Sequence, residues 1–574
     1  MVPSDLHIPE AAQNETETPR EVRPLIPGGR RLGRFLPFAI LLLVAVVLTR
    51  GVSKGEFNID NDETIHAFTG RYIADFLSDL PLAHPVQYTY AYYAQYPALG
   101  IIHWPPFFHF VEALMFLLFG SSVVTARLTV LLFALVGLYF WWKLLNELDN
   151  PLTASLSTLL LAFSPGLLLY EKAVMLEVPS LAMSIMASYW WVRFLKEGRS
   201  RLLYAFVFSA SLALLTKQQC IYLALFCPLT ATILRKWRLL VSWSTVKAFA
   251  IMLLLVAPFY LLAFSVHWRV ISAHLVHLRV TSGPLFKGAS SLIHRPLFYW
   301  AILPRQVGWL VLGLSFLGML TFRLWARREN VLLMLAWIFA CYVTLTSFAS
   351  KDARYIVYWL PPFMYFAAAL FTNGSIPRRA RGLAAVLAVA LLGLNTSQAW
   401  SFQRPYVSGF APVAQRVTRM RECGVVLFDG DLAENFIFYV RLYDEGRCFV
   451  VLRKALYVSA IMDRFGVQEL VHTREELDQL IQEYGIKYVV VEDIGTPRFP
   501  IQRTLREYLQ SGKFKLTDSF PIESNEPEWQ GRRFLVYENE RGGAPTEKFL
   551  RIRMLTLNYD IVVPLDPLIS PSRR

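Results

Sequence analysis

An acidic cluster, Asp60-Asn61-Asp62-Glu63, closely follows the first strongly apolar segment of the chain. Ionisable side chains beside a membrane span are costly to bury and are candidates for function. Asp60 and Glu63 can also be explained as a helix start, in which Asp60 is the N-cap and Glu63 completes a capping box. That explanation leaves Asp62 without a role. We therefore expect Asp62 to act as a catalytic base or as a ligand.

A second acidic group is Glu177 in the segment YEKAVMLEVPS, between two apolar runs and two residues before Pro179. One interpretation is an interfacial glutamate that pairs with Lys172. The other is a functional carboxylate that faces the Asp62 cluster across a cavity. Both interpretations remain open at this point.

A third group is cationic. Lys217 lies in ALLTKQQ, and Lys351 and Arg354 lie in SKDARYIVYWLPPF, all at the ends of apolar segments. Basic side chains that anchor a span at the membrane surface would look the same. The alternative is a phosphate site, because lysine and arginine hold phosphate by charge-assisted hydrogen bonds and arginine can do so with two donors.

Metal binding has weak support in the sequence. Several histidines and basic residues crowd the loop 267–304, where we expect mainly a surface that faces water and lipid headgroups. His274 and His277 could hold a metal only if a carboxylate from another loop joined them. The five cysteines have no metal-ligand spacing. A divalent metal is possible, and its ligands are unknown.

The composition requires lipid as part of the solvent. Of the 574 residues, 55% are hydrophobic and only 17% are charged, which is too apolar for a soluble enzyme of several domains. The net charge of +14 does not indicate nucleic-acid binding. Many of the basic residues lie in short loops between apolar segments, where they set the orientation in a membrane.

About eleven membrane spans are expected, each close to the length of roughly 20 residues that crosses a bilayer. They lie near residues 35–51, 123–145, 151–169, 178–196, 202–217, 219–235, 247–266, 305–323, 331–348, 355–373 and 382–398. The arginine-rich segment 1–34 is expected to be cytoplasmic and disordered, and the first span to act as an uncleaved anchor.

Alternation of the spans then places every strongly basic short loop on the cytoplasmic side, as the positive-inside rule requires. These loops contain Lys196, Arg199 and Arg201; Arg235, Lys236 and Arg238; Arg323, Arg327 and Arg328; and Arg378, Arg379 and Arg381. The candidate site residues and the tail after residue 399 fall on the opposite side. The expected location is a multi-pass membrane protein, in the inner membrane if the chain is bacterial.

The segment from His103-Trp104-Pro105-Pro106 to Gly120 is apolar but only about 15 residues long and follows two prolines. This length suits an interfacial or re-entrant helix better than a full crossing. Counting it as a span would also break the agreement of the basic loops.

Residues 400–574 form a separate unit in which strand and helix patterns alternate, from CGVVLFDG to IKYVVVED. Such units predict an α/β layer with a mainly parallel sheet. Cys423 and Cys448 stand just ahead of two consecutive expected strands. In an oxidising compartment they could form a disulfide.

Together these segments resemble the GT-C glycosyltransferases, and within them the protein O-mannosyltransferases and the aminoarabinose transferases that modify lipid A. The matching motifs are Asp62-Glu63 in DNDETIHAFTGRYI; Pro105, Pro106, Gly120 and Arg127 in IIHWPPFFHFVEALMFLLFGSSVVTARL; MLEVPS; LTK; and ARYIVYWLPP. The resemblance covers roughly residues 35–400.

Two departures from these families bear on function. The aminoarabinose transferases carry charged residues directly before the double proline, where this chain has His103-Trp104. The protein O-mannosyltransferases carry a β-trefoil insert in a later loop, and no loop here is long enough to hold one. Transfer to a lipid or glycan is therefore favoured over transfer to a protein.

The resemblance implies an α-helical polytopic membrane enzyme with a catalytic first outer loop, 52–122, that uses a polyprenyl-phosphate sugar as donor. Asp62 would be the base, and Glu63 or Glu177 would support it. Lys217, Arg354 and Lys351 would bind the donor phosphate. Asp60, His103 and Tyr355 would line the pocket for donor or acceptor.

Two other classes of function remain. A transporter or flippase for a lipid-linked glycan would show charged residues near mid-membrane and two matching halves, and neither is found in the sequence. A scaffold that only displays the tail would not need eleven spans with charges gathered on one face.

Overall fold

The computed structural model describes residues 29–57, 62–276, 291–322, 328–348, 351–372, 376–419, 423–459, 467–495, 497–540, 542–554 and 559–570. Helices build the first 400 residues. They are α1 (Gly29–Thr49), α2 (Asp62–Asp79), α3 (Pro85–Gln95), α4 (Phe107–Phe119), α5 (Val123–Leu148), α6 (Pro151–Ala162), α7 (Pro165–Glu171), α8 (Glu177–Glu197), α9 (Ser200–Leu214), η1 (Gln218–Tyr222), α10 (Leu223–Ile233), η2 (Trp237–Leu239), α11 (Trp243–Val276), α12 (Ser291–Val307), α13 (Trp309–Thr321), α14 (Arg328–Ser347), η5 (Ala353–Trp359), α15 (Leu360–Thr372) and α16 (Arg378–Ser401).

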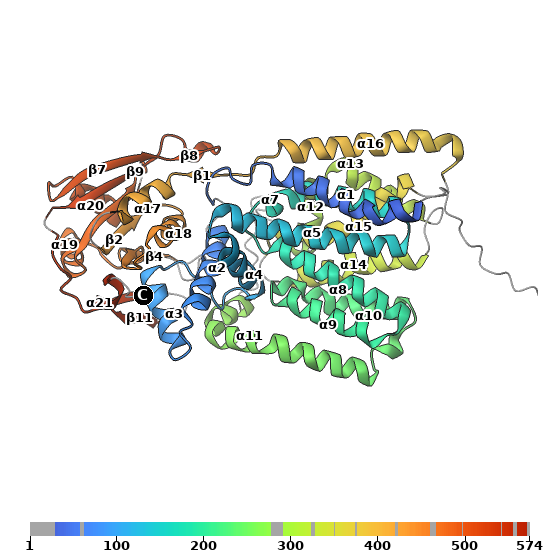
Figure 1. Cartoon of the computed structure of the whole chain (residues 1–574), viewed down its shortest axis with the longest axis horizontal. Helices are drawn as coiled ribbons and strands as arrows, with labels where there is room; N and C mark the ends of the chain where they lie inside the picture. Colours follow the sequence, from blue (N-terminus) through green and yellow to red (C-terminus); the bar gives the residue numbers. More distant parts are fainter. Residues whose placement is uncertain are drawn as a thin grey trace, which may run out of the picture.

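Strands and shorter helices build the tail. They are β1 (Val407–Ser408), α17 (Phe410–Thr418), β2 (Gly424–Asp429), α18 (Ala433–Tyr443), β3 (Phe449–Leu452), β4 (Tyr457–Ser459), β5 (Val467–Glu469), α19 (Arg474–Glu483), β6 (Ile486–Glu492), α20 (Pro500–Leu509), β7 (Phe514–Pro521), β8 (Glu523–Ser524), η6 (Pro527–Trp529), β9 (Arg533–Asn539), β10 (Phe549–Met554), β11 (Tyr559–Pro564) and α21 (Asp566–Ile569). Figure 1 shows the helical bundle at one end, the α/β tail at the other, and α2, α3 and α4 between them.

The helical part contains membrane-spanning elements. Among the described residues, five helices are long and apolar enough to cross a bilayer, and two bent pairs, α6 with α7 and α12 with α13, pass the same test together. Each of the eleven expected spans coincides with a helix, a bent pair, or a short 3₁₀ helix joined to a helix. The chain is therefore a multi-pass membrane protein, and the count of eleven stays a prediction.

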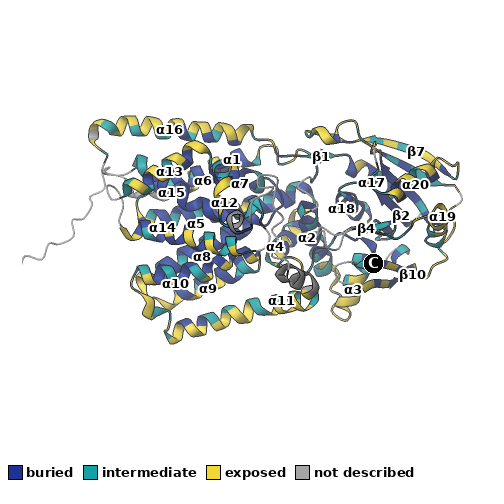
Figure 2. Ribbon diagram, turned by 180° about the vertical axis from the view of Figure 1, so that it is seen from behind, coloured by how far each residue is buried: buried dark blue, intermediate teal, exposed yellow. Residues whose placement is uncertain are grey.

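Exposed apolar side chains on the outer helices agree with a lipid environment. Figure 2 shows that α11 and α16 present long exposed stretches on the outside of the bundle. On α11 these include Leu253, Leu254 and Leu261, each more than 60% exposed. An apolar surface of this kind is unfavourable in water and ordinary against lipid.

The segment between the first two expected spans, 52–122, contains a short apolar helix, as expected. α4 has 13 residues, which at 1.5 Å per residue is too short for a bilayer core of about 30 Å. It begins directly after Pro106 and buries Phe108, Ala113 and Phe116. It packs mainly against α2 and also against α5. α1 begins at Gly29, inside the segment 1–34 that was expected to be disordered, and residues 1–28 of this segment lie outside the described part.

The tail contains a five-stranded sheet in the order β3-β2-β6-β9-β7. β3, β2 and β6 are parallel, as the strand–helix–strand pattern predicts, whereas β9 and β7 add antiparallel strands that the pattern did not indicate. On β2, Val426 and Phe428 belong to the core shared with α17 and α18, while Val425 and Leu427 pack with α19 and α20. The sheet therefore has helices on both faces.

The disulfide between Cys423 and Cys448 is present, with the two Cα atoms 5.2 Å apart. It forms because β2 and β3 are parallel neighbours in register, Gly424 beside Phe449, so the two cysteines just ahead of them meet at one edge of the sheet.

We expect reduction of this disulfide, which closes a loop with a sequence separation of 25, to destabilise the tail by about 3.5 kcal/mol. Mass mapping under reducing and non-reducing conditions identifies the bond, and the thermal midpoint of the purified protein with and without reductant measures its effect. Cys423→Ser/Cys448→Ser should be insensitive to reductant. Two free thiols in the wild type would contradict the assignment.

The tail is attached to α2 by a buried ionic network around Asp75. Arg441 of α18 donates to both carboxylate oxygens of Asp75, at 2.7 and 2.9 Å, and Arg447 donates to it at 3.0 Å. Arg71 and the Tyr92 hydroxyl also donate to Asp75. Separating α2 from the tail would leave these charges buried without their partners, which is costly. The network therefore holds α2 in a fixed orientation against the tail.

A second attachment is made by Glu56, in the loop after α1. Its carboxylate accepts hydrogen bonds from the backbone N–H groups of Phe410 and Ala411, each at 3.0 Å, at the start of α17. Burial raises the pKa of Glu56 to about 7 from its ordinary value of 4.5, against the lowering effect of these N–H donors.

A pH dependence of stability follows from Glu56. The folded protein holds this proton more tightly than the unfolded chain, so the contribution is fully present below pH 4.5 and is lost as the pH rises through about 7. We expect the thermal midpoint of the wild type to fall more between pH 5 and pH 8 than that of Glu56→Gln. Equal slopes for the two proteins would contradict this assignment.

Candidate active site

Asp62 is the first residue of α2. A carboxylate at this position is stabilised by the partial positive charge of the helix N-terminus. The side chain is 17% exposed, and its Oδ2 accepts a hydrogen bond from Nη1 of Arg354 at 2.8 Å. Asp62 is therefore a carboxylate that solvent can reach, with one strong cationic partner.

Arg354 enters the site from the start of η5. Asp352 caps this 3₁₀ helix by accepting the Arg354 backbone N–H at 3.0 Å, and it also accepts from the guanidinium Nε at 2.8 Å. The same Nε lies 3.7 Å from Oε1 of Glu177. One guanidinium thus lies among three carboxylates that come from distant parts of the chain.

Glu177 and Lys217 form a buried ion pair behind Arg354. Glu177 opens α8 and is fully buried, and Lys217, three residues after the end of α9, donates to its Oε1. A carboxylate at a helix N-terminus and a cation after a helix C-terminus both complement the helix dipoles. Oε2 of Glu177 has no hydrogen-bond partner among the described residues. The sequence left open whether Glu177 pairs with Lys172. In the structure its cationic partners are Lys217 and Arg354 instead.

Four segments far apart in sequence therefore meet in one cluster, which we call the Asp62 cluster: Asp62, Glu177, Lys217, Asp352 and Arg354. It contains three carboxylates and two cations. Tyr355 lies against it, with Nζ of Lys217 5.5 Å from its ring centroid. Cations at such a distance from an aromatic face are attracted to it.

Glu63 points away from Asp62, because neighbouring residues on a helix do not face each other. It is fully buried, accepts the Val174 backbone N–H at 3.1 Å, and lies 3.6 Å from Nε of Arg127. Arg127 in turn donates to the carbonyls of Val52 and Glu56, at 2.8 and 2.9 Å. Glu63 thus connects α2 to the turn between α7 and α8 and, through Arg127, to the loop before α2.

Two other predicted site residues, Lys351 and His103, have their printed contacts elsewhere. Lys351 donates to the carbonyls of Leu345, Thr346 and Phe348 at the end of α14. His103 packs edge-on against Trp104, with ring centroids 4.4 Å apart. Asp60 lies outside the described residues, as does His277. The helix cap proposed for Asp60 therefore stays a prediction.

Asp352 and a pair of buried histidines were not among the predicted site residues. Nδ1 of His66 and Nε2 of His109 are 3.1 Å apart. Burial lowers the pKa of His66, and the nearby charges of His109, Lys217 and Arg354 lower it further. The sequence contained one indication that His66 lies near the cluster. It follows Asp62 by four residues, which places both on the same face of α2. Within the described residues, no three His, Cys, Asp or Glu side chains are grouped to hold a metal ion.

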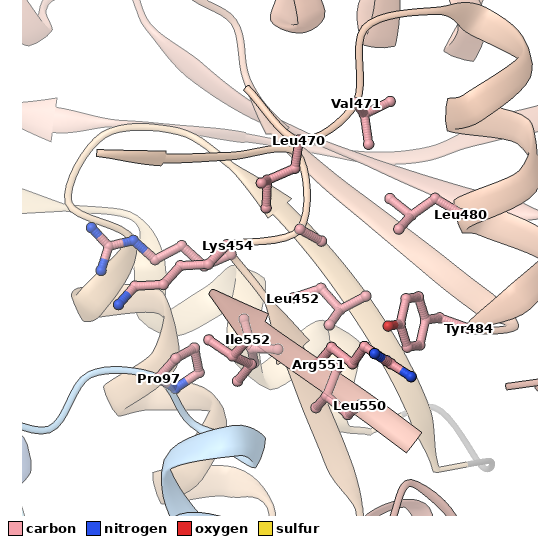
Figure 3. A pocket seen from close by; sticks show the side chains of 13 residues that line it. Pro97, Leu452, Lys454, Leu470, Val471, Leu480, Tyr484, Leu550, Arg551 and Ile552 are labelled. Atoms are coloured by element: carbon pink, nitrogen blue, oxygen red, sulfur yellow. The ribbon is translucent and has the colours of Figure 1, made fainter. Parts of the chain in front are cut away.

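The tail has a pocket of its own, of about 190 Å³, between the end of β3, α19 and β10. Figure 3 shows apolar side chains such as Leu452 and Leu480 in it, with Tyr484 beside Arg551 at one side and Pro97, from the segment before α4, at another. It contains none of the predicted site residues.

Comparison with known proteins identifies the fold. The family described as dolichyl-phosphate-mannose-protein mannosyltransferase matches residues 103–280, a segment that includes Glu177 and Lys217. No curated protein matches the chain.

Two solved structures are similar over nearly the whole chain. ArnT from Cupriavidus metallidurans bound to undecaprenyl phosphate has 16% identity and a TM-score of 0.57, covering 88% of this chain and 99% of its own. The same protein in the apo state has 14% identity and a TM-score of 0.59, covering 89% and 98%. The expected GT-C fold is thereby confirmed.

Proposed function

We propose that this protein is a glycosyltransferase that transfers a sugar from a polyprenyl-phosphate-linked donor to a lipid, glycan or protein acceptor on the outer face of the membrane. The observation that carries the proposal is the Asp62 cluster: a solvent-accessible carboxylate lies 2.8 Å from an arginine that is backed by a buried lysine–glutamate pair. The shared fold with an ArnT that binds undecaprenyl phosphate supports this donor class.

In the proposed reaction, the acceptor hydroxyl attacks the anomeric carbon of the donor sugar. Its proton passes to Asp62, the bond between that carbon and the phosphate oxygen breaks, and polyprenyl phosphate leaves. Arg354 and Lys217 stabilise the negative charge that develops on the departing phosphate. Glu177 positions both cations, and Tyr355 lies beside Lys217.

The charges of the cluster favour an ordered sequence of binding. Three carboxylates share two cations, so a phosphate that binds Arg354 competes with Asp62 for the guanidinium. Donor binding would thus release Oδ2 of Asp62 from its ion pair and leave it free to accept the hydroxyl proton. Asp352 and Glu177 would keep Arg354 in place during this exchange.

The orientation and the acceptor rest on sequence. The basic short loops at the far ends of the spans support an outer-face location for the Asp62 cluster and for the α/β tail 400–574. The two departures from the mannosyltransferase and aminoarabinose transferase patterns favour a lipid or glycan acceptor.

The test is a transfer assay with purified protein in lipid nanodiscs. Polyprenyl-phosphate sugars and nucleotide sugars, each with a labelled sugar, are supplied with candidate acceptors. We expect transfer from a polyprenyl-phosphate sugar with release of polyprenyl phosphate, and none from nucleotide sugars. Transfer from a nucleotide sugar would overturn the donor class. The transporter alternative is tested with the protein reconstituted in vesicles. Movement of a lipid-linked glycan across the vesicle membrane, without any sugar transfer, would support it.

A further inference from the structure

A polar pocket lies at the end of the bundle that faces the tail, and none of the Asp62 cluster residues lines it. Its volume is about 230 Å³, and it is lined by the loop after α1, the turn after α7 and the segment from α16 to β1. Figure 1 shows α1 and α16 side by side, where these segments meet. We call it the Arg50 pocket. Its lining residues are Arg50, Gly51, Lys54, Lys172, Trp400, Ser401, Phe402, Gln403, Arg404 and Tyr406.

The pocket has a strong excess of positive charge. Four of its lining side chains are basic and, among the described residues, none is acidic. Arg50 and Lys54 are exposed at its edge, whereas Lys172 and Arg404 are buried. Nη1 of Arg404 has no hydrogen-bond partner within the described part of the chain. Glu171 and Glu63, which are not among the lining residues, offset part of the charge of Lys172 and Arg404, and the remaining like charges are stabilised when an anion joins them.

Titration of the buried lysine reflects this excess. Burial lowers the pKa of Lys172, and the positive charges of Arg50 and Arg404 lower it further, against the opposing effect of Glu171. Its ammonium donates to the carbonyl of Ala399 at 3.3 Å. Lys172 therefore connects the turn after α7 to the end of α16, and an anion in the pocket would compensate its charge.

Aromatic side chains alternate with the cations. The guanidinium of Arg50 stacks on Trp400 at 4.3 Å, and its Nη1 donates to the Trp400 carbonyl at 2.9 Å. Lys54 lies 4.8 Å from the ring centroid of Tyr406. Gly55, with φ of +65°, permits this close approach, since a Cβ there would lie 2.5 Å from Tyr406. Tryptophan and tyrosine beside basic residues at the end of a span are typical of the headgroup level of a membrane.

We propose that the Arg50 pocket binds the phosphate of a membrane lipid headgroup, with Arg50 and Lys54 as the contacts at its edge and Lys172 and Arg404 beneath them. The position at the ends of α1 and α16 supports a lipid as the source of this phosphate, because its acyl chains could run along these helices. Such a lipid would connect the first span, the last helix of the bundle and the start of the tail. This proposal goes beyond sugar transfer and does not depend on it.

The test uses Arg50→Gln/Lys54→Gln in nanodiscs of phosphatidylcholine with or without phosphatidylglycerol. A lipid that binds the folded state raises its thermal midpoint. We expect phosphatidylglycerol to raise the midpoint of the wild type and to be retained in native mass spectrometry. The variant should bind it at least about tenfold more weakly, since each charge-assisted hydrogen bond to phosphate contributes roughly a factor of ten.

Arg238→Gln/Lys247→Gln is the matched control. Arg238 and Lys247 are also exposed cations over tryptophan rings, each 5.7 Å from the ring centroid, but they lie outside the pocket. This variant should retain the wild-type response. Equal losses in both variants would mean non-specific attraction and would overturn the proposal, as would a wild type that responds equally to both lipids. If inorganic phosphate raised the thermal midpoint of the wild type equally in nanodiscs of phosphatidylcholine alone, a lipid would not be the source of the bound phosphate.

Discussion

Replacing Asp62 with asparagine is expected to reduce sugar transfer by about 10²- to 10⁴-fold, the range for loss of a positioned general base. Asparagine has nearly the same shape and can still accept a hydrogen bond from Arg354, but it cannot take the acceptor proton. We therefore expect kcat to fall. The KM for the donor should fall as well, because the neutral asparagine competes less with the donor phosphate for Arg354. The measurement is steady-state transfer from a polyprenyl-phosphate sugar.

Asp352→Asn is the matched control for this result. Asp352 also contacts Arg354 at 2.8 Å and is more exposed than Asp62, with 36% of its side chain accessible against 17%. It caps η5 and takes no proton in the proposed reaction. If Asp352→Asn lost as much activity as Asp62→Asn, the loss would reflect a changed ion pair around Arg354 and not a missing base.

Replacing Arg354 with glutamine should produce the second large effect. The variant loses the cation that contacts Asp62 and that would stabilise the leaving phosphate, so we expect kcat to fall by about 10²- to 10³-fold. Arg354→Lys should recover only part of the activity, because an ammonium cannot present the two parallel donors of a guanidinium. Both kcat and the affinity for polyprenyl phosphate are measured.

Two further variants make the Arg354 result interpretable. Arg532→Gln changes an arginine of the same exposure, 24%, which also pairs with a carboxylate but lies in the tail, outside the Asp62 cluster and the Asp75 network. It should keep near wild-type transfer. The double variant Asp352→Asn/Arg354→Gln also removes one of the carboxylates that lose their cation when Arg354 is replaced. If charge imbalance alone destabilised Arg354→Gln, the double variant would regain stability but not activity. Full transfer by Arg354→Gln would refute the phosphate role.

The sequence predicted which residues gather but not how each side chain points. Asp62, Glu177, Lys217 and Arg354 were grouped because all lie at the ends of apolar segments on one side, and the structure brings these four together. This grouping used the sidedness expected from the basic loops, and that expectation needs no knowledge of packing.

The same reasoning cannot assign partners within a group. Lys351 and Arg354 are three residues apart, yet Lys351 caps α14 while Arg354 reaches Asp62. Glu63 is adjacent to Asp62 but pairs with Arg127, because a step of one residue on a helix turns a side chain by about 100°. These outcomes depend on the exact position at which each helix begins and ends, which apolar patterns leave uncertain by several residues.

The tail shows the same division. The parallel strands β2 and β3 and the disulfide ahead of them follow from a local strand–helix–strand pattern. β9 and β7 join the sheet by antiparallel pairing that depends on contacts distant in sequence. The network of Asp75 with Arg441 and Arg447 is likewise distant, by more than 360 residues, and no periodic pattern indicates it.

The central claim is that Arg354 and Lys217 hold the donor phosphate opposite Asp62. An electron cryomicroscopy structure of Asp62→Asn in nanodiscs with a polyprenyl-phosphate sugar tests it most directly, since the inactive variant should retain the intact donor. We expect phosphate density in contact with Arg354 and Lys217, and the anomeric carbon facing residue 62. Donor phosphate bound away from both cations, for example in the Arg50 pocket, would contradict the claim.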